Sequence, residues 1–479
     1  MRSRVALLVM AVAVSAVSAG AQLPDTPAGR ELAGWLVAFN AGNRDGLRSF
    51  YEQHYPSAVG RVDQMMNFHE RTGGFDFMKV SASAPNHIVA YVKERASDQF
   101  ATATLDVDSV APHQITALQL NAIPRPAEFA IKRTDEKELL GSLRERLDQD
   151  TAAGRFSGAV LLARGGKPIF EAAYGLGDRD RRIPNTLDTR FRIGSMNKMF
   201  TATAVLQLVQ AGKVKLEAPL AAYLPDYPNK ELASKVTIHH LLTHTGGTGD
   251  IFTPEYNAHR LELRTLADYV TLYGNRPLAF EPGSKWEYSN YGFILLGRVI
   301  ERVSGMSYYD YVAKHIFAPA GMTSSGSEPE DSVVKNRSIG YTSMGATGVR
   351  PNTETLPWRG TSAGGGYSTV GDLLRFADAL RAHKLLDARH TELLTTGKVQ
   401  TPGGGKYAYG FGDHTTSGLR CVGHNGGAPG MNGDLEICDD GYVVVALANM
   451  DPPAAGRITD YIINRLPVTR DETKASASR

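Results

Sequence analysis

Ser195 and Lys198 lie three residues apart in the segment 191–200, Phe-Arg-Ile-Gly-Ser-Met-Asn-Lys-Met-Phe, which opens a helical pattern. Residues i and i+3 share one face of a helix, so the lysine amine can reach the serine hydroxyl. A serine at its ordinary pKa is a weak nucleophile and needs an adjacent base, which a neutral, desolvated lysine can supply. The residues around the lysine are apolar, and burial lowers the pKa of an amine as a base requires. The segment therefore predicts a helix that begins at a reactive serine.

A Ser-x-x-Lys pair alone is common by chance, but two later segments strengthen it. Tyr-Ser-Asn occupies residues 288–290, and His-Asn-Gly-Gly occupies residues 424–427. In this order the three segments resemble the signature of serine hydrolases that form a covalent acyl-enzyme.

The resemblance extends well beyond the three motifs. The chain resembles the serine β-lactamase-like hydrolases over roughly residues 135–468, specifically the branch of class C β-lactamases, D-alanyl-D-alanine carboxypeptidases and esterases. The fold class that this implies is α/β, with an antiparallel sheet flanked by helices and carrying a helical insertion. Further matching segments are residues 156–163, 238–247, 280–291, 363–373 and 423–430.

The resemblance implies a role for each motif residue. Ser195 would be the nucleophile, and a helix N-cap is the alternative role of a serine at this place. Lys198 would be the base or a proton relay, and Tyr288 would pass a proton to the leaving group. Asn290 would point its amide at the substrate carbonyl or at the lysine. The backbone N–H groups of Ser195 and Gly427 would form an oxyanion hole, which is typically worth several kcal/mol.

The third motif departs from the β-lactamase pattern. His424 stands where β-lactamases of this branch carry the lysine of Lys-Thr-Gly. A permanent cation there would hold a substrate carboxylate, whereas a histidine is only partly charged near neutral pH. Peptidases and esterases of the branch often have histidine here, so the resemblance favours ester or peptide substrates over β-lactams. Asn425 and Gly426 are candidate substrate-binding residues, with a turn or strand-edge role as the alternative.

Charge and metal-ligand spacing argue against several other functions. The formal net charge is +2, from 52 basic and 50 acidic residues, which gives no electrostatic reason to expect nucleic acid or an anionic membrane as a partner. His240 and His244 have an i, i+4 spacing, but no Glu follows His240, so both are interpreted as structural. We expect no metal and no organic cofactor, and a small molecule or peptide as substrate. The oligomeric state is not predicted.

The first 21 residues read as a cleavable signal peptide. Residues 1–4 are basic, residues 5–17 are apolar, and Ala19-Gly20-Ala21 is a small-x-small cleavage site. The apolar run is short for a membrane span, although an uncleaved anchor is the alternative. Cleavage near Ala21 would make the protein periplasmic or secreted, with no stable membrane span.

Cys421 and Cys438 are the only cysteines of the chain. They flank residues 426–433, a glycine-rich loop between two segments with a strand pattern, and a hairpin centred there places them opposite each other. In an oxidising compartment they could form a disulfide, whereas two separate buried thiols are the alternative.

The pattern of elements predicts two domains. Residues 22–127 show helical segments at 31–51 and 57–71 followed by strands, and this order is similar to a small α+β, NTF2-like cone domain. Residues 128–134 are the predicted linker, following a pair of prolines. Residues 135–468 form the hydrolase domain, and the polar tail 469–479 is predicted to be disordered.

The sequence thus predicts an exported serine hydrolase of the esterase or D-peptidase type that acts through an acyl-enzyme. A class C β-lactamase and a non-catalytic, penicillin-binding-like protein are the alternatives, because one fold hosts all of these functions.

Overall fold

The computed structural model describes residues 22–344, 348–416 and 418–468, so the predicted signal peptide and the C-terminal tail lie outside it. The chain divides into two compact units, residues 1–130 and 131–479, and the boundary falls within the segment predicted as a linker. None of the helices in these ranges has the length and apolar character to cross a membrane.

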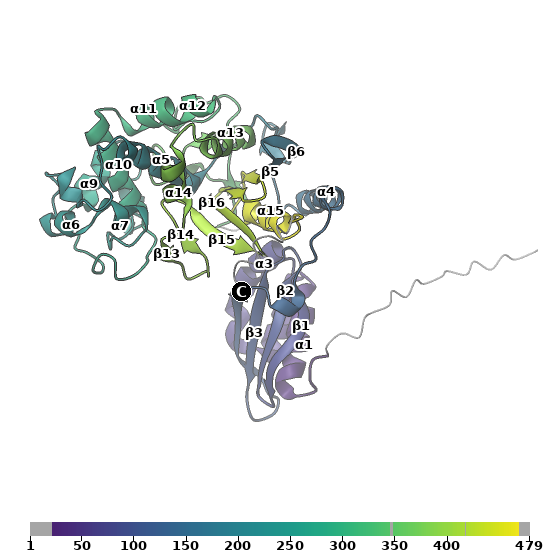
Figure 1. Cartoon of the computed structure of the whole chain (residues 1–479). Helices are drawn as coiled ribbons and strands as arrows, with labels where there is room; N and C mark the ends of the chain where they lie inside the picture. The colour runs from purple at the N-terminus through teal and green to yellow at the C-terminus, as the bar shows by residue number, and fades with distance from the viewer. Residues whose placement is uncertain (1–21, 345–347, 417, 469–479) are drawn as a thin grey trace, which may run out of the picture. The chain divides into compact units, whose positions relative to one another are not determined.

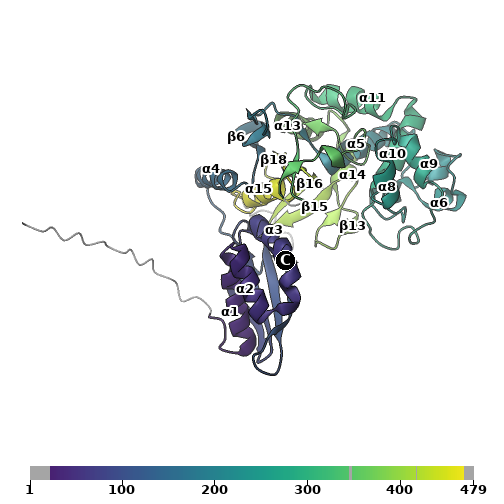
Figure 2. The ribbon, with the colours of Figure 1, turned by 180° about the vertical axis from the view of Figure 1, so that it is seen from behind.

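In the first unit, the helices come first along the chain and an antiparallel sheet follows them (Figures 1 and 2). Its helices are α1 (Pro27–Asn40), α2 (Arg44–His54) and α3 (Val62–Thr72), with a 3-10 turn η1 (Pro56–Arg61) before α3. The four strands, in the order β1-β2-β3-β4, are Phe75–Ala84, His87–Glu94, Phe100–Val107 and Ile115–Ile123. This α+β order is the predicted one, while the likeness to an NTF2-like domain stays a prediction.

The predicted helix over residues 31–51 is wrong as a single element, because the chain breaks between α1 and α2. Gly42 adopts a φ of +61°, a left-handed conformation that favours glycine. Asn43 then caps α2, since its side-chain oxygen accepts hydrogen bonds from the backbone N–H groups of Asp45 and Gly46. The helical spacing of apolar residues continues across this turn because both helices pack on the same core, with Trp35 and Tyr51 both buried.

The second unit is built on a sheet of eight antiparallel strands, in the order β13-β14-β15-β16-β17-β18-β5-β6. Strands β5 (Gly158–Arg164) and β6 (Lys167–Tyr174) come from the start of the domain. The others come from its end: β13 (Val399–Gln400), β14 (Lys406–Tyr407), β15 (Gly412–Thr416), β16 (Leu419–Ala428), β17 (Met431–Cys438) and β18 (Tyr442–Ala448). The predicted antiparallel sheet is therefore confirmed, and its strands come from both ends of the domain.

Alternation along the central strands gives this sheet two apolar faces. In β18, Val443, Val445 and Leu447 belong to the core with α5 (Asn197–Gln210), α10 (Asn290–Ser304) and α13 (Val370–Arg381). Val444 and Ala446 belong instead to the core with α4 (Glu136–Ala152) and α15 (Ala454–Ile463). Because successive strand residues point to opposite faces, a wholly apolar strand is expected where helices cover both. The result is a helix–sheet–helix arrangement.

The predicted helical insertion lies between β6 and β13. Besides α5 and α10, its helices are α6 (Lys230–Lys235), α7 (Ile238–Leu242), α8 (Pro254–His259), α9 (Leu266–Tyr273), α11 (Tyr308–Val312) and α12 (Ala318–Ala320), followed by α13 and α14 (Ala388–Thr395). Short strands β7 (Leu176–Asp178), β8 (Ile183–Pro184), β9 (Phe191–Arg192), β10 (Tyr341–Thr342), β11 (Arg350–Pro351) and β12 (Tyr367–Ser368) make two-stranded pairings outside the main sheet.

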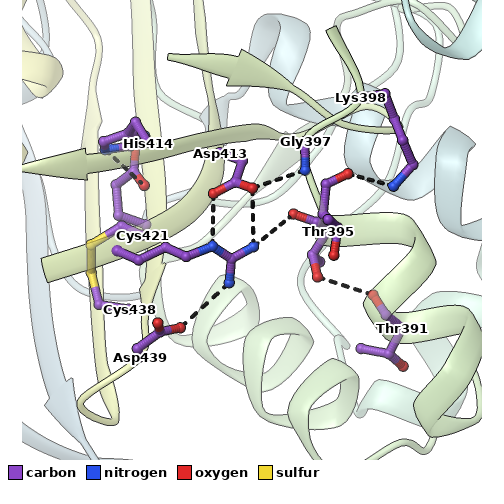
Figure 3. Close-up of polar contacts among 12 residues, drawn as sticks. Thr391, Thr395, Gly397, Lys398, Asp413, His414, Cys421, Cys438 and Asp439 are labelled. Atoms are coloured by element: carbon purple, nitrogen blue, oxygen red, sulfur yellow. Dashed lines mark hydrogen bonds and ion pairs between the residues drawn. A yellow bond between two sulfur atoms is a disulfide. The ribbon is translucent and has the colours of Figure 1, made fainter. Parts of the chain in front are cut away.

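The loop of the β16–β17 hairpin is shorter than predicted. Residues 426–433 were expected to form a loop, but the strands continue to Ala428 and resume at Met431, so Gly426, Gly427 and Gly433 lie within strands. The centre of the hairpin is the expected one, and Cys421 pairs with Cys438 and forms a disulfide with it (Figure 3).

Beside this disulfide, an ion pair ties strand β15 to its neighbours. Asp413 accepts hydrogen bonds from the Arg420 guanidinium at 2.8 and 3.1 Å and from the backbone N–H of Gly397 at 2.8 Å (Figure 3). Arg420 also donates to the carbonyl of Thr395 at the end of α14. These contacts hold the β15–β16 side of the sheet, which carries the third motif, against the helical layer.

Candidate active site

Ser195 lies at the entrance to helix α5, on a 3-10 turn η3 (Gly194–Met196) that precedes the first helical residue. Gly194 adopts a φ of +54°, so this tight turn requires glycine. Gly194 and Met196 are buried, whereas Ser195 is only half-buried. The turn therefore presents its serine, and not its neighbours, to a reacting molecule.

Lys198 lies one helical turn further on and is fully buried. Its Nζ donates to Asn290 Oδ1 at 2.7 Å and to the carbonyl of Ala363, and it lies 3.1 Å from Ser195 Oγ. Burial lowers the pKa of this amine to about 7, because an ammonium is poorly solvated there, and the Asp250 carboxylate opposes the shift. Near neutral pH a substantial fraction of the lysine is therefore uncharged.

The partners of Lys198 determine where its lone pair points. A neutral amine has two N–H groups and one lone pair, and carbonyl oxygens can only accept hydrogen bonds. Asn290 Oδ1 and the Ala363 carbonyl thus take the two N–H groups, and the lone pair is left facing the Ser195 hydroxyl. This is the geometry that a general base requires.

Tyr288 lies beside this pair and is partly exposed. Its ring faces the lysine, with Lys198 Nζ 4.6 Å from the ring centroid, and it shares a hydrogen bond with Ser195. Burial raises the pKa of Tyr288 well above its ordinary value, and the hydrogen bond with Ser195 only partly offsets this. At neutral pH Tyr288 is therefore a protonated phenol that can donate, while Lys198 is the group poised to accept.

Asn290 is the first residue of helix α10, and its side-chain amide forms hydrogen bonds with both Asp250 and Lys198. Its Nδ2 donates to Asp250 Oδ2 and its backbone N–H donates to Asp250 Oδ1, both at 3.1 Å. Its Oδ1 accepts from Lys198. The intervening Ser289 caps the helix, since its hydroxyl oxygen accepts a hydrogen bond from the backbone N–H of Gly292.

Strand β16 brings its glycines against the serine turn. A Cβ built on Gly426 would lie 1.9 Å from the Ile193 carbonyl oxygen and 2.9 Å from the Ser195 nitrogen. A Cβ on Gly194 would in turn lie 3.0 Å from the Gly427 nitrogen. The backbones of the two predicted oxyanion donors, Ser195 and Gly427, are therefore adjacent, and this close approach is possible only with glycine.

His424 is buried on the same strand, and both ring nitrogens have partners. Nε2 lies 3.0 Å from Tyr407 Oη, and Nδ1 contacts the backbone carbonyl of Asn425. A carbonyl accepts only, so Nδ1 carries the proton and Tyr407 donates to Nε2. Burial, and to a smaller extent the neighbouring Lys198, lower the pKa of His424 to about 3. His424 is neutral at physiological pH and offers no positive charge to a substrate carboxylate.

His244 has the structural surroundings expected of it. The backbone N–H of Ser289 donates to its Nδ1 at 3.0 Å, and its ring packs against Tyr288 and Tyr407 with centroids 4.3 and 4.7 Å away. Burial lowers the pKa of His244 well below its usual range, and the Lys198 charge adds to this. The side chain therefore supports Tyr288 as a neutral ring.

A family model described as Beta-lactamase matches residues 143–467, which is more than half of the chain. The chain belongs to the beta-lactamase family. The match covers the described second unit nearly completely and includes every motif residue named above.

Three relatives of this beta-lactamase-family chain indicate the range of its family. Esterase EstB from Burkholderia gladioli is 32% identical over 326 residues, covering 60% of this chain and 81% of the esterase. The crystal structure of a penicillin-binding protein from Bacillus halodurans has a TM-score of 0.61 and 34% identity, covering 67% of this chain and 98% of that one. The crystal structure of a D-amino acid amidase from Ochrobactrum anthropi has a TM-score of 0.59 and 25% identity, and the match covers 71% of this chain and 100% of the amidase.

Among the predicted site residues, Asn425 is the one that the structure does not bring toward Ser195. Alternation along β16 places it on the face opposite His424, and its side chain is exposed. Conversely, Asp250, Tyr407 and the Ala363 carbonyl contact the motif residues without having been assigned a role. A backbone carbonyl leaves no signal in a sequence, and the other two are ordinary residues far from the motifs they contact.

Proposed function

We propose that this beta-lactamase-family chain is a serine hydrolase that transfers an acyl group from an ester, amide or peptide to water. Ser195 attacks the carbonyl and Lys198 takes its proton, while the backbone N–H groups of Ser195 and Gly427 hold the oxyanion. Tyr288 supplies a proton to the leaving group. Water then enters by the reverse of these steps and releases the acyl group.

One observation carries this proposal: the lone pair of a buried lysine with a pKa of about 7 faces a half-exposed serine hydroxyl at 3.1 Å. A structural lysine gains nothing from complete burial beside a hydroxyl, since desolvation of its charge is costly. The esterase and the amidase among the relatives support acyl-transfer chemistry.

The neutral His424 favours substrates of the esterase or D-peptidase type over β-lactams. β-Lactams carry a carboxylate, and the place at which the β-lactamases of this branch offer a lysine is occupied here by an uncharged ring. An uncharged side chain at this place suits an ester, an amide or an internal peptide bond, none of which brings a carboxylate to be held there.

The experiment is intact-mass spectrometry of the purified chain after treatment with a fluorophosphonate and, separately, with a penicillin. We expect a single fluorophosphonate adduct that is absent from the Ser195→Ala variant. A persistent penicillin adduct would favour a penicillin-binding peptidase, while rapid turnover of penicillin would favour the lactamase alternative. Failure of both reagents to modify the native chain would contradict the proposal and favour a binding protein.

The pH dependence of acylation provides a second check. Only unprotonated Lys198 can accept the serine proton, and its pKa is about 7. The labelling rate is therefore expected to rise about tenfold per pH unit below pH 7 and to level off above it. A fluorophosphonate time course from pH 5 to 9 measures this. A labelling rate that stays constant from pH 5 to 9 would show that Lys198 is not the base.

The proposal includes export to the periplasm or the medium. It rests on the basic, apolar and small-x-small segments of residues 1–21. The disulfide between Cys421 and Cys438 supports an oxidising compartment, because cytosolic thiols are kept reduced.

A further inference from the structure

Asp250 lies on the loop before helix α8 and contacts no reacting atom, yet it holds one end of the hydrogen-bond chain that ends at Ser195. The chain runs from Asp250 through Asn290 and Lys198 to the serine hydroxyl, with steps of 3.1, 2.7 and 3.1 Å. The backbone N–H of Ile251 also donates to Asp250 Oδ1, at 2.6 Å, which anchors the carboxylate on its own loop.

An asparagine amide has two chemically opposite ends, and an incorrect orientation would disable the base. With Oδ1 toward Lys198, the amide accepts one N–H of the neutral amine and leaves the lone pair for the serine. With Nδ2 toward Lys198, the amide would donate to that lone pair and occupy it. The contacts of Asn290 with Lys198 alone do not select between these orientations, because a neutral amine can both donate and accept.

Resting on the function proposed above, we infer that Asp250 is a positioning residue that fixes the amide of Asn290 and thereby aims the lone pair of Lys198 at Ser195. A carboxylate can only accept hydrogen bonds, so it admits only the Nδ2 end of the amide. The same carboxylate also accepts the backbone N–H of Asn290, which fixes the position of the residue as well as its orientation.

Asp250 also determines the charge near the lysine. The titratable groups that face Lys198 are Tyr288, His244, His424 and Asp250. The first three are neutral at physiological pH, because burial raises the pKa of the tyrosine and lowers the pKa of the histidines. Asp250 is the group whose charge favours the ammonium form of Lys198.

The test is Asp250→Asn, with the fluorophosphonate labelling rate of Ser195 measured from pH 5 to 9. The new amide at position 250 can donate as well as accept, so both orientations of Asn290 become possible. We expect the plateau rate to fall by about tenfold to a hundredfold, as for a misplaced catalytic group. Loss of the negative charge should also move the midpoint of the acid limb to a lower pH than in the native chain. Asp226→Asn, at an exposed acidic residue, is the matched control and should change neither quantity.

The exchange variant, Asp250→Asn together with Asn290→Asp, is a second test that can be read even if the single variant does not fold. It places a donor at position 250 and keeps an acceptor facing Lys198, but it moves the carboxylate next to the amine. The midpoint should then move above its native value, opposite to the shift in the single variant. An unchanged midpoint, or a shift of both variants in one direction, would overturn the inference.

These outcomes are separable from failure of the proposed function. If the native chain is not labelled at Ser195, the hydrolase proposal itself fails. If the native chain is labelled and Asp250→Asn retains its rate and midpoint, only the role of Asp250 is rejected. A lower rate with an unmoved midpoint would indicate a purely structural contribution and would also reject it.

Discussion

Replacement of Lys198 by methionine is expected to slow the acylation of Ser195 by about 10³-fold, within the range that general-base catalysis supplies. The amine is the group whose lone pair faces the serine hydroxyl, at 3.1 Å. Tyr288 does not replace it, because burial raises the pKa of the phenol and keeps it protonated. The labelling rate with a fluorophosphonate at pH 8, followed by intact mass, measures the loss.

The same variant should unfold at a temperature at least as high as the native chain. The pKa of Lys198 is about 7 in the fold, against an ordinary value of 10.5. Between these pH values the unfolded chain binds more protons than the folded one, so the burial penalty decreases as pH rises from 7 to 10.5. Methionine removes this penalty, while the loss of donors to Asn290 and Ala363 costs a few kcal/mol in return. Any gain in stability is therefore largest at pH 7 and below and declines toward pH 10.5.

Lys213→Met, at an exposed lysine just after α5, is the control for Lys198→Met. It removes a charge without touching the site and should leave the labelling rate and the thermal midpoint unchanged. A Lys198→Met variant that keeps its fold and is labelled within tenfold of the native rate would show that another group activates Ser195. The assignment of the base would then be rejected.

The local part of the site was predictable because it depends on one helix. The spacing of Ser195 and Lys198 requires only that residues i and i+3 share a face, and the 3-10 turn η3 together with the start of helix α5 at Asn197 provides this. The strands of the second unit were predictable for a similar reason, since their apolar runs and alternation are local patterns. The register of the hairpin followed from its centre, which placed Cys421 opposite Cys438.

The remaining parts of the site depend on contacts between distant segments. Asp250 and Asn290 are 40 residues apart, and Lys198 and Ala363 are 165 apart. No local pattern marks Ala363, because its side chain takes no part in the contact. The glycines of β16 were interpreted as a loop since glycine is typical of turns, whereas Gly426 is needed for the close approach of a strand to the serine turn.

Gly426→Ala is expected to reduce acylation by about 10²- to 10³-fold, the loss that follows removal of one oxyanion donor. The new Cβ would lie 1.9 Å from the Ile193 carbonyl oxygen and 2.9 Å from the Ser195 nitrogen, so β16 and the serine turn must separate. Separation moves the backbone N–H groups of Ser195 and Gly427 apart, although no catalytic side chain changes. The measurement is the fluorophosphonate labelling rate, corrected for the folded fraction from thermal unfolding.

Gly158→Ala is the matched control for Gly426→Ala, since its Cβ would lie equally close to a backbone carbonyl, 1.9 Å from the oxygen of Leu447. Gly158 lies on β5, three strands away from β16 in the sheet. Both variants should lose about 1–3 kcal/mol of stability through overpacking, but only Gly426→Ala should lose acylation per folded molecule. Equal losses of acylation in the two variants would show that general stability limits the reaction, and would contradict the assignment of the Ser195 and Gly427 amides as the oxyanion hole.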